Sequence, residues 1–135
     1  MEVKEYFENY TRFVDSVTSE SSRNDTLYAE RMKQLSKLLN GNYARLDHAV
    51  TGLAGESGEV ADLWKKVKFM SLEYNDETKD KFIKELGDVC WYLFQTAYAL
   101  NIPVNEIIDE NIRKLQKRHP EGHFSPEYLQ HKKAE

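Results

Sequence analysis

Apolar residues recur every three or four positions along most of this chain, and that spacing limits what the chain can fold into. Side chains at such intervals return to the same face of an α-helix. No segment shows the strict alternation of apolar and polar residues that a half-buried strand needs. Gly and Pro, which punctuate turn-rich β-folds, number only 6 and 3 in 135 residues. We therefore predict an all-α fold.

Five segments carry the helical pattern, and each ends at a polar stretch, an Asn/Gly turn or a proline. They are Val3–Val17, Leu27–Leu39, Tyr43–Phe69, Glu77–Leu100 and Asn105–Arg118. Residues 19–25 are predicted to be a polar break, and Ser125 and Pro126 are predicted to start one more short turn. Because the chain has no internal repeat and no low-complexity tract, we predict a single domain.

Composition excludes several classes of protein. With 40% apolar and 31% charged residues, the chain does not resemble a disordered protein. Its net charge of -4 provides no general basic field, so nucleic acid is not an expected partner. Its single cysteine, Cys90, excludes an intrachain disulfide. No apolar run approaches the ~20 residues of a membrane span, and a signal-peptide pattern is absent, so we expect a cytoplasmic protein.

Two pairs of acidic residues carry the strongest functional signal. Glu56 and Glu59 are three residues apart in one predicted helix, and each therefore shares a face with the other. Glu85 and Asp88 have the same spacing in the next predicted helix. Both pairs lie within or beside an apolar stripe, where carboxylates are rare unless they are paired or bind metal. Either pair alone is more often a solvated helix face.

The positions of the two pairs add a second clue. If the two helices fold back as an antiparallel hairpin, residues equally far from the loop lie level with each other. Glu56 and Asp88 are symmetric about residue 72, at the centre of the predicted loop, and so are Glu59 and Glu85. The four carboxylates are therefore predicted to meet at one height of the hairpin.

A cationic stripe falls into the same register. Asn111, Lys114 and Arg118 share one face of the last predicted helix, and Lys114 is symmetric with Asp88 about residue 101, at the next predicted turn. We therefore expect this stripe to lie level with the carboxylates. The alternative is that these cations serve only the helix C-terminus, where the helix dipole favours positive charge.

The ligand types indicate the chemistry of such a cluster. Oxygen-only ligands favour Mg²⁺ or Mn²⁺ over zinc or copper, and the Glu-x-x-His motifs of di-iron bundles are absent. A carboxylate-held cation flanked by Lys and Arg suits a polyphosphate substrate. His48 and Tyr92 lie on nearly the same sides of their helices as the carboxylates and are candidates for a base or sugar pocket. Simple packing is the alternative role for both.

Three segments of the chain resemble the MazG-like, all-α nucleoside triphosphate pyrophosphohydrolases. Glu56-x-x-Glu59, followed after 25 residues by Glu85-x-x-Asp88, resembles the ExxE…ExxD signature of that family. Residues 52–62 and 85–93 resemble its two metal-binding helices, and residues 111–120 resemble its Asn-x-x-Lys-x-x-x-Arg segment. The likeness covers residues 43–124, which leaves an N-terminal helical extension over residues 1–42 and a C-terminal tail over residues 125–135.

The resemblance implies a four-helix bundle-like fold that assembles as a homodimer or homotetramer. It implies Mg²⁺- or Mn²⁺-dependent hydrolysis of NTPs or dNTPs to the monophosphate and pyrophosphate, in control of nucleotide pools. The four carboxylates would hold the metal, with Asp62 as a candidate auxiliary ligand. Asn111, Lys114 and Arg118 would bind the triphosphate. The short form resembles versions carried by bacteriophages, which would place it in the host cytoplasm.

Two alternative functions stay open. One is a narrow dUTP/dCTP or dGTP pyrophosphatase, and the other is a noncatalytic helical oligomer that binds nucleotide or metal.

The helix predicted over Glu77–Leu100 itself favours an oligomer. Trp91 and Tyr98 lie on a side away from both its acidic side and its predicted core stripe. That core stripe consists of Phe82, Leu86, Val89, Leu93 and Ala97. We expect either another subunit or the N-terminal segment to cover the two aromatic residues.

Overall fold

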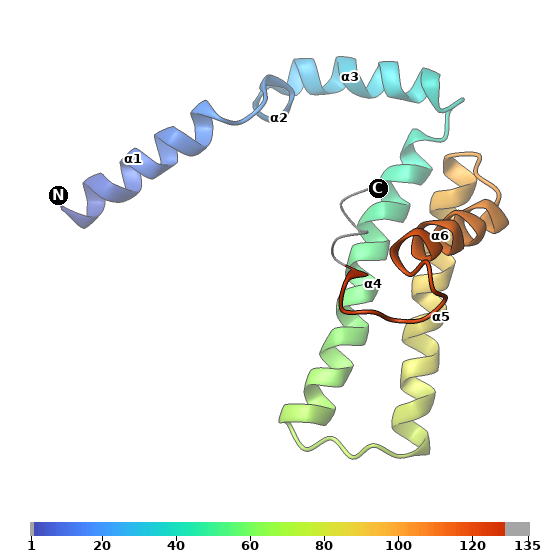
Figure 1. Ribbon diagram of the computed structural model, residues 1–135. Coiled ribbons are helices and arrows are strands. Elements are labelled where there is room, and N and C mark those ends of the chain that lie inside the picture. Colours follow the sequence, from blue (N-terminus) through green and yellow to red (C-terminus); the bar gives the residue numbers. More distant parts are fainter. Residues whose placement is uncertain (1, 129–135) are drawn as a thin grey trace. The chain divides into compact units, whose positions relative to one another are not determined.

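In a computed structural model of the chain, residues 2–128 are described; these residues form six helices and no strand (Figure 1). The prediction of an all-α fold is confirmed. The chain divides into two compact units, and the boundary between them in the sequence lies between Tyr43 and Ala44. Of the predicted C-terminal tail, residues 129–135 lie outside the described residues. None of the described helices is both long enough and apolar enough to cross a membrane.

The first unit contains α1 (Val3–Ser16), a short helix α2 (Glu20–Arg23) and α3 (Asp25–Leu38). The prediction of a simple polar break over residues 19–25 is wrong, because α2 occupies the middle of it. The guanidinium of Arg23 forms ion pairs with Asp15 at 3.2 Å and with Glu20 at 3.0 Å. These contacts tie α2 to the end of α1.

A side-chain cap sets the start of α3. The Asn24 side chain accepts hydrogen bonds from the backbone N–H groups of Thr26 and Leu27, at 3.0 and 3.1 Å. Such a cap satisfies N–H groups that have no partner within the helix. The helix therefore begins two residues before the apolar pattern that predicted it.

The apolar face of α1 is exposed along its whole length. No residue of this helix is buried. Its exposed large apolar residues are Val3, Tyr6, Phe7, Tyr10, Phe13 and Val14, and Val17 continues the stripe at the C-cap. A 14-residue helix is marginal in water without a packed face, so we expect another surface to cover this one.

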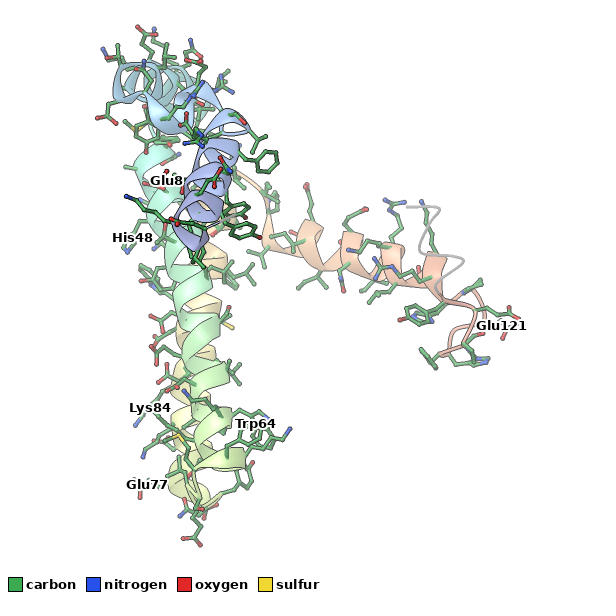
Figure 2. All side chains as sticks on the ribbon, turned by 90° about the vertical axis from the view of Figure 1, so that its left-hand side faces the viewer. Glu8, His48, Trp64, Glu77, Lys84 and Glu121 are labelled. Atoms are coloured by element: carbon green, nitrogen blue, oxygen red, sulfur yellow. The ribbon has the colours of Figure 1, made fainter. Side chains whose placement is uncertain are left out.

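In the second unit, α4 (Tyr43–Phe69) and α5 (Asp76–Ala99) form an antiparallel hairpin (Figures 1 and 2). The helical spacing predicted both helices to within one residue at each end. At the start of α5, the Asn75 side chain accepts the N–H of Thr78 at 3.0 Å. The buried Thr78 hydroxyl donates to the carbonyl of Glu73, which fixes the end of the loop to the helix.

α6 (Val104–Arg118) follows a turn in which Asn101 has a φ of 55°. It points away from the hairpin rather than back along α5 (Figure 2). Its apolar residues Ile108, Ile112 and Leu115 remain exposed. The helix predicted over Asn105–Arg118 is thus present, and its apolar face is open among the described residues of the second unit.

The core of a single chain is small. The buried apolar residues among those described are Ala49, Leu63, Ala97 and Ala99. Ala97 belongs to the predicted core stripe of α5, but Leu86 of the same stripe is 51% exposed. Trp91 and Tyr98, predicted to lie away from that stripe, are 51% and 65% exposed. The stripe stays open because, among the described residues of the second unit, α4 is the helix that runs beside α5 along its length.

Candidate functional site

Three of the four predicted carboxylates converge between the facing helices of the hairpin. Glu56 of α4 and Glu85 and Asp88 of α5 each offer one oxygen, and these oxygens lie within 4.8 Å of one another. Glu56 and Glu85 are half-buried, whereas Asp88 is exposed. The hairpin therefore places the two helices in a register in which their acidic residues lie level.

Glu59 is exposed and is not one of these three residues, but its negative charge acts on the group. Partial desolvation raises the pKa of Glu56, and the nearby carboxylates of Asp88, Glu85 and Glu59 raise it further. The four acidic residues therefore form one field of like charge around Glu56. Such a field favours either a proton or a cation at its centre.

Asp62 is held by lysines rather than by the carboxylate group. Its two oxygens pair with the ammonium groups of Lys65 and Lys66, each at 2.7 Å. The hydrogen bonds from Lys65 and Lys66, in that order, lower the pKa of Asp62 to about 2. Asp62 is thus a fixed anion beside the site and is not among the three residues that converge.

Lys66 is a residue of the site that the sequence analysis missed. Asp62 is the main cause of its raised pKa, and the charges of Glu59 and Glu85 add to the shift. Lys66 therefore brings a cation close to the acidic residues from within α4. Its spacing of seven residues from Glu59, or two helical turns, is the signal that could have revealed it.

Tyr92 packs directly on the backbone of α4. A Cβ atom added to Gly52 would stand 2.1 Å from Cε1 of the Tyr92 ring, whereas Cβ atoms on Gly55 and Gly58 would meet nothing within 4 Å. The absence of a side chain at Gly52 is therefore what allows the ring to lie there. His48 lies one turn before Gly52 on α4, at the end of the hairpin away from the loop (Figure 2).

His48 and Tyr92, the two predicted pocket residues, belong to one aromatic group. The His48 ring contacts Tyr92 edge-on with centroids 5.6 Å apart, and Trp91 with centroids 6.4 Å apart. Trp91 and Tyr92 are themselves perpendicular, with centroids 4.8 Å apart. This group lies one to two turns from Glu56 and Asp88 along the same two helices.

A pocket of about 300 Å³ opens beside these rings. Its lining residues are Ala44, Arg45, His48, Ala49, Trp91 and Gln95. Arg45 donates a hydrogen bond from Nη1 to Oε1 of Gln95 at 2.6 Å, and its guanidinium lies 4.5 Å from the centroid of the Tyr98 ring. Neither Arg45 nor Gln95 is among the site residues predicted from the sequence. Their helical positions could have revealed them, because each shares a face with a carboxylate of the site.

The predicted phosphate-binding residues lie on α6. Lys114 and Arg118 are half-buried and Asn111 is exposed. The charges that act on Glu56 are those of Asp88, Glu85 and Glu59, and neither Lys114 nor Arg118 is among them. Within residues 2–128, the raised pKa of Glu56 thus gives no sign of the cationic stripe. The prediction assumed that α6 returns along α5, whereas after the turn at Asn101 α6 points away from the hairpin (Figure 2).

Comparison with known proteins places the hairpin in a family. The model of the MazG nucleotide pyrophosphohydrolase domain matches residues 46–123 of this chain. The Gene 37 protein of Mycobacterium phage L5 is 36% identical over 78 residues, which cover 57% of this chain and 68% of that protein. No solved structure matches. The matched region begins within α4 and contains every acidic residue of the site.

Proposed function

Because this chain belongs to the MazG nucleotide pyrophosphohydrolase family, we propose that it hydrolyses nucleoside triphosphates to the monophosphate and pyrophosphate. In this reaction water cleaves the anhydride bond between the α- and β-phosphates. The observation that carries the proposal is the convergence of Glu56, Glu85 and Asp88 within 4.8 Å, inside the matched region. A nucleotide-pool role in the cytoplasm is part of the same proposal.

The donor set suits a hard divalent cation, Mg²⁺ or Mn²⁺. Mg²⁺ binds oxygen ligands at 2.0–2.1 Å, so two opposite ligands stand about 4.2 Å apart. The oxygens of Glu56, Glu85 and Asp88 lie within 4.8 Å of one another, so small side-chain rotations would let one cation bind between them. A bound cation would polarise phosphate oxygens and lower the pKa of water. We assign these three residues as ligands, with Glu59 completing the set and Asp62 as an auxiliary anion.

The cations of the chain would bind the phosphates. Lys66 already lies near the acidic residues, and it would neutralise charge on the phosphates nearest the hairpin. Asn111, Lys114 and Arg118 would hold the pyrophosphate as it leaves, once α6 is brought to the site. His48 and Tyr92 would bind the base or the sugar, since their rings form one group beside the carboxylates.

We also propose a homo-oligomer, a dimer or a tetramer, as the active form. The exposed aromatic residues of α5 and the exposed apolar face of α6 are surfaces that a second copy would cover. In such an assembly the α6 helices are held in place, and the four-helix bundle-like fold is completed between subunits. The position of the α6 cations then depends on the subunit contact.

The test is incubation of the protein with each NTP and dNTP and Mg²⁺, followed by chromatographic identification of the products. Release of pyrophosphate and monophosphate is expected. Orthophosphate as the first product would overturn the choice of bond, and nucleotide binding without any product would favour the noncatalytic alternative.

Two variants of α5 connect the activity to the carboxylates. Glu85→Gln should abolish turnover, whereas Glu77→Gln on the exposed first turn of the same helix is the matched control. Equal activity of the two variants would contradict the assigned site.

A further inference from the structure

We propose that Arg45 and Gln95 select the base of the substrate, and that the pocket they line prefers keto bases, guanine first, over the amino bases adenine and cytosine. This inference rests on the proposed function, because it assigns the base end of the same substrate. Neither residue belongs to the acidic signature or to the predicted phosphate-binding stripe.

The contact between the two side chains fixes what the pocket can offer. A guanidinium has only donors, so the Gln95 atom that faces it at 2.6 Å is the carbonyl oxygen. The NH₂ group of Gln95 must then point the other way, and it can only donate. Arg45 keeps further N–H donors beside the one it uses, and the indole of Trp91 on the same pocket wall has only a donor. The pocket is therefore rich in donors.

Bases differ in what they present to such a wall. Guanine offers two adjacent acceptors, O6 and N7, and thymine offers O4; uracil presents the same O4 acceptor. Adenine and cytosine instead offer an exocyclic NH₂ donor at the equivalent position. A donor of the protein facing a donor of the base leaves both without a partner, and a site built on hydrogen bonds rejects such a ligand strongly. Guanine matches best because its two acceptors can take two donors at once.

The pocket also lies where a base should be. Arg45 precedes Glu56 by eleven residues and Gln95 follows Asp88 by seven, so each differs from its carboxylate by only about 20° around its helix. Along the helix axes these separations are about 16 Å and about 10 Å, and the α-phosphate and sugar of an extended nucleotide would lie between the cleaved bond and the base. The rings of His48 and Trp91 line the same pocket and provide faces on which a base can stack.

The experiment compares kcat/KM for dGTP, dATP, dUTP and dCTP. The wild-type protein should favour dGTP over dATP, and dUTP over dCTP, by about tenfold or more. Gln95→Met keeps the length of the side chain and removes its amide. It should lower the dGTP/dATP and dUTP/dCTP ratios of kcat/KM about fivefold or more. The kcat/KM values for dATP and dCTP themselves should change less than twofold. The matched control is Gln34→Met, because Gln34 accepts a hydrogen bond from Arg31 at 3.1 Å in α3, outside the pocket. That variant should leave both ratios unchanged.

A second measurement separates this inference from the proposed function. Binding of dGMP and dAMP to the wild-type protein, measured by calorimetry, does not require turnover. Binding of dGMP about tenfold tighter is expected. Equal affinities, or tighter binding of dAMP, would overturn the assignment of Arg45 and Gln95 whether or not any triphosphate is hydrolysed. Hydrolysis of all four triphosphates at equal rates would overturn it too and leave the proposed function intact.

Discussion

Gly52→Ala should destabilise the hairpin, although alanine is normally the better helix residue. The added methyl group would stand 2.1, 2.3 and 2.5 Å from three atoms of the Tyr92 ring. The ring cannot easily yield, because His48 contacts its edge and Trp91 lies perpendicular to it. Either the ring leaves its place or α4 and α5 move apart at this level.

The magnitude follows from two opposing effects. Alanine in place of glycine in a helix interior stabilises by about 1 kcal/mol. Overpacking a filled position costs about 1–3 kcal/mol. The net change for Gly52→Ala is therefore a loss of about 0–2 kcal/mol. Gly55→Ala meets nothing within 4 Å and should keep its gain of about 1 kcal/mol. The two variants should thus differ by about 1–3 kcal/mol.

Urea unfolding followed by circular dichroism, at one protein concentration for all variants, measures this difference. Gly58→Ala is a second control with open space. The double variant Gly52→Ala/Tyr92→Leu should recover most of the loss, because the smaller side chain makes room for the methyl group. If Gly52→Ala proves as stable as the two control variants, the packing of Tyr92 on α4 described above is wrong.

Three further predictions concern the charges and the assembly. Glu56→Gln should raise the stability of the metal-free protein at pH 7, because a neutral side chain there avoids the cost of partial desolvation and the repulsion by Asp88, Glu85 and Glu59. An acid whose pKa is raised in the folded protein costs stability only at pH values above its ordinary pKa of 4.5. The gain in melting temperature should therefore vanish below pH 4.5. A gain that is the same at every pH would contradict this explanation. Lys114→Ala should lose about 1.5–3 kcal/mol of transition-state stabilisation, calculated from kcat/KM, while Lys117→Ala should change kcat/KM little. Equal losses in the two variants would contradict the role assigned to Lys114. Phe94 is another aromatic residue of α5 and is 56% exposed, so Phe94→Glu should split the oligomer in light scattering. A wild-type mass near 15.8 kDa with full activity would exclude the oligomer.

The helices could be predicted from the sequence because their causes are local. Spacing of apolar residues defines α4 and α5, and an asparagine side chain caps the start of α5. The meeting of Glu56 with Asp88 could also be predicted, since a hairpin of straight helices has one register once its loop is located. Both features depend on residues that are close together in the sequence and on one short loop.

Other parts of the site depend on contacts that no spacing specifies. The position of Lys114 could not be predicted, because it depends on the path of α6 after Asn101 and not on distance from the turn. The pair of Arg45 with Gln95 joins residues fifty positions apart, and their side-chain rotamers decide whether they meet. The expected core failed for a related reason. Leu86 of the predicted stripe stays exposed because α4 of the hairpin does not cover it.

The boundary between Tyr43 and Ala44 has a consequence for how such a gene can change. The family match starts at residue 46, so the three helices of the first unit lie before the matched region. Recombination near codon 43 could exchange them as a block without altering one side chain of the carboxylate group or of the pocket around Arg45. Related genes should therefore encode unrelated sequences before this boundary and similar, gradually diverging sequences after it.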